Sequence, residues 1–286
     1  MKNLNAILVP VDFSEHSKMI LRQAADIARY AKAQLIILHT YHKPLLSKPA
    51  EKLLSKNLVD SIERHKLKRM HDKMHHKYQE LYDSIPTLNE VHTKFLLRSG
   101  YVVNNIIKIN ETEKIDLILM GTRGVHGVKE FLSTKTADIC MQLSTPVLVV
   151  PYRYEYQPIR KIAFAYDLKM IKHQHALQML KLFSMAYNAE IHIITITKNE
   201  KISDKERENL ETLKKDFAEF NPIYFIKGGK NVEKEIYNYL RENDISMLGL
   251  LHRDKSLFSE ILHGSMTKNF SLHSDIPLLA LDDRDL

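Results

Sequence analysis

The sequence is poor in residues that cross-link or interrupt a chain. Cys140 is the only cysteine among 286 residues, so no internal disulfide can form, and a small buried thiol is typical of a reduced compartment. Eight glycines and nine prolines are too few for long disordered linkers. No apolar run approaches the roughly 18 residues of a membrane span. The stretch Ala6–Val11 contains Pro10 and ends at Asp12, so we expect no secretory signal and a cytoplasmic protein.

What is present is an ordinary globular mixture with one basic segment. The length suits two domains, and apolar and charged residues make up 44% and 27% of the chain. Residues 43–80 carry ten Lys/Arg against five Asp/Glu, which supplies +5 of the formal charge of +7. We interpret them as a long solvated helix over about 45–83, because the segment has no nucleic-acid motif. A nucleic-acid surface is the alternative. His71 and His75 have helical i, i+4 spacing, but the pattern has no third metal ligand.

An internal repeat runs through the chain. Three stretches of the first half recur in the same order in the second half. The pairs are AILVPVDFS (6–14) with KIAFAYDLK (161–169), DLILMG (116–121) with DISMLG (244–249), and TPVLVVP (145–151) with IPLLALD (276–282). Thr134 and Ser265 each lie twelve residues before the proline of the third pair. The repeat indicates a duplication, with domains at 1–152 and 159–286 on either side of a polar stretch.

Short apolar runs alternate with helical patterns in both halves. We expect strands at Ala6–Val11, Leu35–Thr40, Val91–Arg98, Leu117–Met120, Val147–Val150, Ile162–Tyr166, Ile191–Thr197, Ile223–Lys227, Met247–Leu250 and Leu278–Leu281. We expect helices after Ser14, over 45–83, and at 102–110, 134–143, 173–186, 204–220, 232–243 and 265–273. This alternation predicts βαβ units and a parallel sheet. The strands are apolar on both faces, as a sheet covered by helices on both sides requires. The fold class is therefore α/β, with two tandem doubly wound domains.

Polar and glycine residues follow two of the predicted strands. Ligands of such sheets bind at the carboxyl ends of the strands, where Asp12 closes the first strand and Gly121 the fourth. The three glycines of 121–127 permit a loop whose N–H groups cradle an anion. Ser133 and Thr134 precede a helix whose start favours phosphate, and Arg123 and Lys135 add positive charge. Asp12 suits a ribose hydroxyl; capping of the first helix is the alternative, and His16 nearby is expected to be solvated.

These landmarks together resemble the universal stress protein domain. The resemblance rests on the strand closed by Asp12, on Met120-Gly121-x-x-Gly124, and on the hydroxyl pair before a helix and the run 146–150. It covers the chain twice, apart from the basic insert. It implies a five-stranded parallel sheet in each half, as in the adenine nucleotide alpha hydrolase-like folds. It also implies antiparallel pairing of the two last strands, which relates the halves by a pseudo-twofold axis, so that a monomer imitates a dimer. A further homodimer stays open.

The resemblance also implies an ATP-type adenine nucleotide, with or without Mg²⁺. Adenine would lie near Thr40, the ribose near Asp12, and the phosphates near Gly121, Gly124 and the hydroxyl pair. Pro10, Val11 and Met120 are further residues of this predicted site. Nucleotide-binding members carry G-x2-G-x9-G-[ST]. In the first half eight residues separate Gly124 from Ser133, and Ser133-Thr134 replaces Gly-Ser.

The second half departs from the pattern differently. Its counterpart residues are Asp167, Gly249, His252, Gly264 and Ser265. Gly264-Ser265 is intact, but His252 stands where the second glycine is expected. His252 and its neighbour Arg253 would either bind an anion directly or fill an empty site.

These features favour a stress-response, nucleotide-binding protein that acts on an unknown protein partner. No general base or metal-binding carboxylate set is readable, so we expect no robust catalysis, although slow ATP hydrolysis is compatible with the site. The alternative is a ligand-free, pseudo-dimeric scaffold with decayed nucleotide sites. An adenylating enzyme is a third possibility. Related enzymes carry Ser-Gly-Gly-x-Asp-Ser after the first strand, where this chain has Val11-Asp12-Phe13-Ser14.

Overall fold

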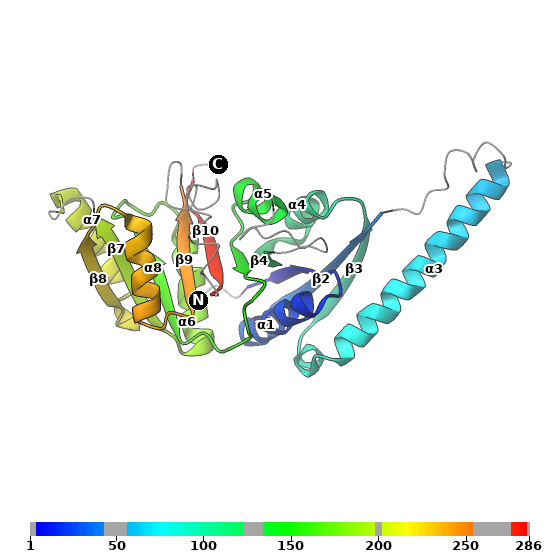
Figure 1. The fold of residues 1–286 in the computed structure, drawn as a ribbon, viewed down its shortest axis with the longest axis horizontal. Helices are drawn as coiled ribbons and strands as arrows, with labels where there is room; N and C mark the ends of the chain where they lie inside the picture. The colour runs from blue at the N-terminus through cyan, green and yellow to red at the C-terminus, as the bar shows by residue number, and fades with distance from the viewer. Residues whose placement is uncertain (1–3, 43–55, 123–133, 198–201, 254–275, 285–286) are drawn as a thin grey trace.

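The structure is a computed structural model that describes residues 4–42, 56–122, 134–197, 202–253 and 276–284 (Figure 1). The first half contains β1 (Ala6–Pro10), α1 (Glu15–Ala31), β2 (Gln34–Tyr41), α3 (Lys56–Asp83), β3 (Thr93–Ser99), α4 (Val102–Glu113), β4 (Ile115–Gly121), α5 (Thr134–Gln142) and β5 (Val147–Val150). The second half contains β6 (Lys161–Ala165), α6 (Gln174–Tyr187), β7 (Glu190–Thr197), α7 (Asp204–Asp216), β8 (Ile223–Gly228), α8 (Val232–Glu242), β9 (Met247–His252) and β10 (Leu278–Asp282). Short 3₁₀ helices lie at Pro86–Glu90 and Ala218–Phe220. The helix expected at 265–273 lies outside the described residues.

The ten strands form one continuous sheet in the order β3-β2-β1-β4-β5-β10-β9-β6-β7-β8. Within each half the pairing is parallel, which confirms two five-stranded, doubly wound units. β5 and β10 pair antiparallel, with Leu148 opposite Leu279. The expected pairing of the last strands is therefore confirmed. It joins the two parallel sheets edge to edge across the centre of the molecule (Figure 1).

Helices cover both faces of this sheet, as the doubly apolar strands require. Ile7 and Val9 of β1 pack in a core with residues of α1, α6 and α7. Leu8 points to the opposite core, which includes residues of α4, α5 and α8. Cys140 is buried in that second core, and burial raises the pKa of its thiol to about 12. It is the small buried residue that the sequence predicts.

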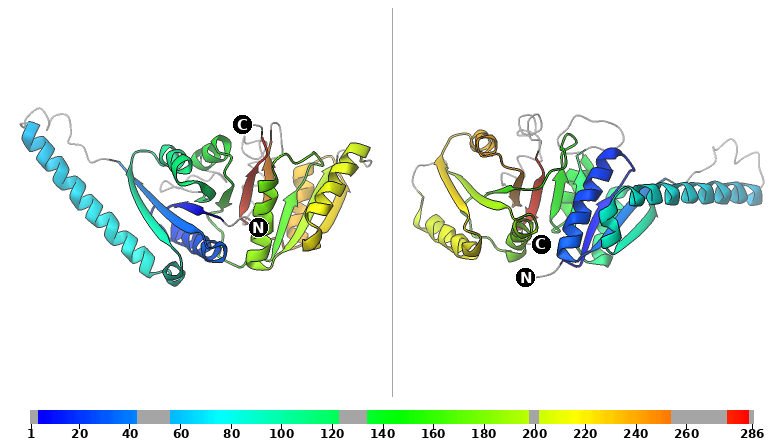
Figure 2. Two further views of the ribbon diagram at one scale, coloured as in Figure 1. Left: turned by 180° about the vertical axis from the view of Figure 1, so that it is seen from behind. Right: turned by 90° about the horizontal axis from the view of Figure 1, so that it is seen from below.

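The basic helix α3 packs against the first half near its C-terminal end and projects beyond the sheet (Figures 1 and 2). Tyr78 stacks on Phe95 of β3 with ring centroids 4.1 Å apart, and Leu81 is buried. His71 hydrogen-bonds Tyr41 at 2.8 Å. No group of three or more potential metal ligands occurs within the described ranges. In the same ranges no helix has both the length and the apolar character to cross a membrane.

The strand pairing fixes which residues of the two halves correspond. Leu117 of β4 pairs with Ile7, and Met247 of β9 pairs with Ile162. Ile7 and Ile162 each lie five residues before the aspartate that follows their strand, so Leu117 and Met247 occupy equivalent places. The sequence-based match of 116–121 with 244–249 is therefore wrong by two residues in this strand.

Two polar side chains confirm the corrected register. The Asp116 carboxylate accepts the backbone N–H groups of Asn5 and Ala6. The Ser246 hydroxyl accepts those of residues 160 and 161 at 2.8 and 2.9 Å. Asp116 and Ser246 thus each accept two successive backbone N–H groups at the start of β1 and of β6, although one is a carboxylate and the other a hydroxyl.

Gly249 is the predicted site residue that this shift displaces. It corresponds to Leu119 in the body of β4, rather than to Gly121 at its end, and it is buried. A Cβ on Gly249 would lie 2.8 Å from Cδ2 of Leu180 in α6. Gly249 therefore permits close packing of α6 on the sheet. The prediction that Gly249 contacts a nucleotide is therefore corrected: its role is in the packing of α6 on β9.

Candidate functional site

A cavity of about 330 Å³ lies at the carboxyl ends of β1, β2 and β4, beside the starts of α1 and α5. Seven residues predicted from the sequence line it: Pro10, Val11, Asp12, Thr40, Met120, Gly121 and Lys135. The other described lining residues are Ser14, His16, Ser17, Ile20, Leu38, His39, His42, Val102 and Thr136. The structure thus brings together the described part of the predicted first-half site.

Asp12 lines the cavity and also supports the start of α1. Its Oδ1 accepts the backbone N–H of Ser14 at 3.0 Å and the Ser14 hydroxyl at 2.6 Å. Ser14 is the N-cap of α1, and its hydroxyl accepts the Ser17 N–H at 3.2 Å. Burial raises the pKa of Asp12, but hydrogen bonds from Ser14 and Ser17 outweigh it and hold the pKa below its ordinary value. Asp12 is therefore an ionised acceptor at neutral pH.

Gly121, the last residue of β4, brings the strand very close to α1. A Cβ on Gly121 would lie 2.5 Å from Nε2 and 2.7 Å from Cδ2 of His16. The His16 ring also contacts Tyr152, with centroids 5.3 Å apart. The expectation that His16 is solvated is therefore wrong. His16 is half-buried between the strand end and the polar stretch after β5.

The first turn of α5 meets the cavity beside β4. The buried Thr136 hydroxyl donates to the carbonyl oxygen of Gly121 at 3.0 Å and fastens α5 to the strand end. Lys135 is exposed at the same end. Helix starts carry unpaired N–H groups and partial positive charge, so Lys135 and α5 together favour an anion here.

His39 of β2 forms a further part of the wall. Its Nδ1 lies 2.8 Å from the Val11 carbonyl oxygen. A carbonyl can only accept, so Nδ1 carries the proton. Burial lowers the pKa of His39, although this hydrogen bond opposes the shift. The His39 ring packs 4.6 Å from the Phe13 ring, and Lys77 of α3 lies 5.6 Å above Phe13. The C-terminal part of α3 therefore reaches the edge of the cavity.

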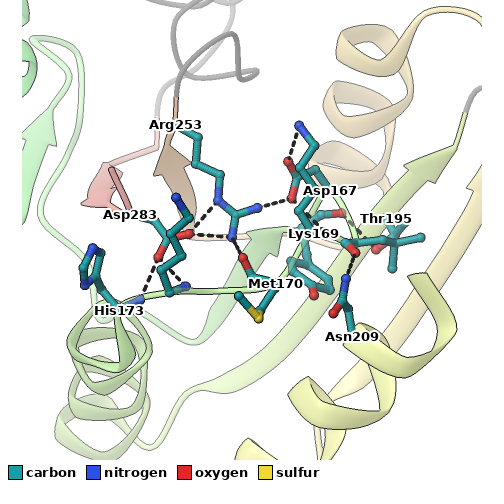
Figure 3. Close-up of polar contacts among 11 residues, drawn as sticks. Asp167, Lys169, Met170, His173, Thr195, Asn209, Arg253 and Asp283 are labelled. Carbon is teal, nitrogen blue, oxygen red and sulfur yellow. Dashed lines mark hydrogen bonds and ion pairs between the residues drawn. The ribbon is translucent and has the colours of Figure 1, made fainter. Parts of the chain in front are cut away.

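The corresponding place in the second half is filled by the chain itself (Figure 3). Asp167 repeats the turn of Asp12, since its Oδ1 accepts the Lys169 N–H at 3.3 Å. The same oxygen also accepts Nη1 of Arg253 at 2.6 Å. His252 ends β9 opposite Asp282 and is buried, with Nδ1 3.7 Å from Oδ1 of Asp282. Of the two interpretations of His252 and Arg253, this geometry favours the filling of a site.

Part of both predicted sites lies outside the described residues. This applies to Arg123, Gly124, Ser133, Gly264 and Ser265, and to the side chain of Thr134, the first residue of α5. Their contacts with a ligand stay predictions.

The profile of the Universal stress protein family matches residues 3–151, slightly more than half of the chain. The chain belongs to this family. Universal stress protein A homolog 1 of Coxiella burnetii is 28% identical over 146 residues, which cover 50% of this chain and 94% of that protein. Universal stress protein YxiE of Bacillus subtilis is 26% identical over 150 residues, covering 51% and 98% respectively.

The second half extends the likeness to the whole chain. The crystal structure of a universal stress protein from Archaeoglobus fulgidus covers 99% of this chain and 100% of its own, with a TM-score of 0.68 at 19% identity. That likeness concerns the fold alone. Because the second half forms a parallel unit with the same strand order as the first, the chain is a tandem universal stress protein.

The sequence-based prediction left six polar residues of this universal stress protein's cavity out of the site: Ser14, His16, Ser17, His39, His42 and Thr136. Three of them carried a usable signal. His39 and His42 flank the end of the second predicted strand, and Thr136 lies in the first turn of a helix that begins beside the fourth. The sequence signal for His16 was weaker, because the burial of His16 depends on a glycine at position 121, which lets β4 come close to α1.

Proposed function

We propose that this universal stress protein binds an ATP-type adenine nucleotide in the first-half cavity. It acts in the cytoplasmic stress response by changing a surface that a protein partner reads, and catalysis is not its main role. The observation that carries the proposal is the meeting of three groups in one cavity. These are the Asp12 carboxylate, the close backbone approach at Gly121, and the cationic start of α5 with Lys135.

Each group suits a different part of a nucleotide. An ionised carboxylate accepts hydrogen bonds from ribose hydroxyls, as Asp12 would do. Helix starts and lysine ammonium groups favour phosphate oxygens, which suits α5 and Lys135. Thr40 and His39, at the end of β2, border the side of the cavity that remains for the base.

Two observations support binding without robust catalysis. The Asp12 carboxylate holds the turn into α1 through Ser14, and His39 is tied to the Val11 carbonyl. A general base must be within reach of the proton that it abstracts, whereas these two side chains are engaged in holding the fold.

The scaffold alternative is favoured by Arg253, which fills the crevice of the second half.

The test is binding of ATP to the full chain and to Asp12→Asn. A ligand that binds the folded state raises its stability, by about 2.7 kcal/mol at one hundred times Kd. We expect ATP to raise the unfolding midpoint of the wild type, and Asp12→Asn to weaken the affinity measured by calorimetry. Asp72→Asn, on the exposed surface of α3, is the matched control. An unchanged midpoint at millimolar ATP would favour the scaffold.

A further inference from the structure

In the second half, a buried guanidinium lies against Asp167, the counterpart of the first-half cavity residue Asp12. Arg253 Nη1 donates to Asp167 Oδ1 at 2.6 Å, Nε donates to Asp283 Oδ2 at 2.7 Å, and Nη2 donates to the Met170 carbonyl oxygen at 3.0 Å. The Arg253 side chain is 10% exposed and that of Asp283 0%. Figure 3 shows the guanidinium between the two carboxylates. All three of its nitrogens are engaged within the chain.

Asp283 is held as firmly as Arg253. Its Oδ1 accepts the backbone N–H groups of Lys172 and His173, each at 2.8 Å, immediately before α6. These amides lead into a helix start, which is the kind of position that binds a ligand phosphate in other proteins. Here the Asp283 carboxylate takes that role; it belongs to residues 276–284, which we call the C-terminal segment. The negative charge at the start of α6 therefore comes from the chain.

The two halves differ in how each aspartate leads into the next helix. α1 begins at Glu15, three residues after Asp12, whereas α6 begins at Gln174, seven residues after Asp167. The longer connection includes Met170, whose carbonyl Arg253 binds, and the two amides that Asp283 binds. The backbone of this longer connection therefore contacts both members of the Arg253–Asp283 ion pair. In the first half, the start of α1 borders the cavity instead.

We infer that the crevice of the second half is an internal latch that fastens the C-terminal segment, and that the chain holds one nucleotide rather than two. Arg253 joins Asp167 after β6 to Asp283 after β10, and through Asp283 it secures the start of α6. The count of one nucleotide rests on the proposed function; the latch does not.

The count is tested by titrating the full chain with ATP. We expect one site per chain, and a clearly weaker affinity of that site in Asp12→Asn. Asp167→Asn, its counterpart in the other half, should leave Kd within about twofold while lowering the unfolding midpoint. Two sites per chain, or a loss of binding in Asp167→Asn equal to that in Asp12→Asn, would overturn the inference. Absence of any binding to the wild type would refute the proposed function and leave the latch to the next experiment.

The latch is tested without nucleotide by a double-mutant cycle in urea. Arg253→Met and Asp283→Asn should each destabilise the chain, and the double variant should be more stable than the sum predicts, by at least about fivefold in the unfolding constant. Arg253→Lys keeps the charge but cannot reach all three acceptors, so partial loss is expected. If Arg253→Met does not fold, Arg253→Lys replaces it in the cycle. Additive effects of the two substitutions on the free energy of unfolding would contradict the latch.

Discussion

At Gly121 the end of β4 approaches α1 more closely than a residue with a Cβ permits. Gly121→Ala would place that atom 2.5 Å from Nε2 of His16 and 3.0 Å from Cδ1 of Ile20. The His16 ring, which lines the cavity, would have to move. Overpacking of this kind costs about 1–3 kcal/mol, and we expect ATP binding to weaken as well. Urea unfolding and calorimetric titration measure the two effects.

Gly249→Ala is the matched control for Gly121→Ala. Its new Cβ would lie 2.8 Å from Cδ2 of Leu180, inside the second half and away from the cavity. We expect a similar loss of stability with unchanged ATP affinity. Equal weakening of binding in both variants would show that Gly121 acts through global stability and not at the site.

The sequence could reveal residues whose role depends on their place along a strand, but not residues whose role depends on a neighbouring element. Asp12 and Gly121 follow strands, so their position at the sheet edge was predictable. His16 was misjudged because its surroundings come from Gly121 and Tyr152. Asp283 carries no local signal, because its partners Lys172, His173 and Arg253 all lie 30 or more residues away along the chain.

At the scale of elements, the described strands and most of the described helices were predictable. Apolar runs placed all ten strands to within two residues at each end, and β5 at its observed bounds. The alignment between halves failed in β9, because Asp116 and Ser246 perform one role with different chemistry. Letter-by-letter matching therefore paired Asp116 with Asp244, and the register slipped.

The contact between β7 and α8 gives an element-scale prediction. Buried His192 accepts the Tyr239 hydroxyl at Nδ1 (2.8 Å) and donates from Nε2 to Glu190 (2.5 Å). Burial lowers the pKa of His192 from 6.5, while Glu190 opposes the shift. Since the unfolded chain then binds more protons, stability is full above about pH 6.5. It falls as pH drops toward the folded pKa, with a slope of at most about 1.4 kcal/mol per pH unit for one histidine.

His192→Ile isolates this effect, because Ile36 stands at the corresponding place in the first half. We expect the free energy of unfolding of the wild type to drop more between pH 7.5 and 5.5 than that of the variant. The pKa of His39 is also lowered by burial, but His39 is present in both proteins and cancels in the comparison. Parallel pH curves for the two proteins would contradict the assignment.

At the scale of the whole molecule, the C-terminal segment connects the two halves beyond the strand pairing of β5 with β10. Arg284 donates from Nη1 to the Met141 carbonyl oxygen at 2.7 Å and from Nη2 to that of Leu143 at 3.4 Å. Its Nε donates to Asp282 at 2.6 Å. These carbonyls lie at the C-terminal end of α5, whose first turn lines the cavity. α5 thus runs from the candidate nucleotide site to Arg284, the residue that follows the latch residue Asp283.

Arg284→Ala should therefore loosen α5 as well as the junction. The variant loses two helix-capping hydrogen bonds and leaves the buried Asp282 carboxylate without its guanidinium, which together cost roughly 2–4 kcal/mol. Hydrogen exchange should accelerate in α5 more than in α8, and ATP affinity should fall because Lys135 and Thr136 share that helix.

Lys214→Ala removes the ion pair with Glu211 on the surface of α7 and serves as the control. Exposed pairs of this kind contribute about 0–1 kcal/mol, so its stability and ATP affinity should match the wild type. If Arg284→Ala resembles Lys214→Ala in urea, the C-terminal segment does not hold the halves together. If it is destabilised without faster exchange in α5, the contribution of Arg284 is confined to Asp282, and the helix does not link the two crevices.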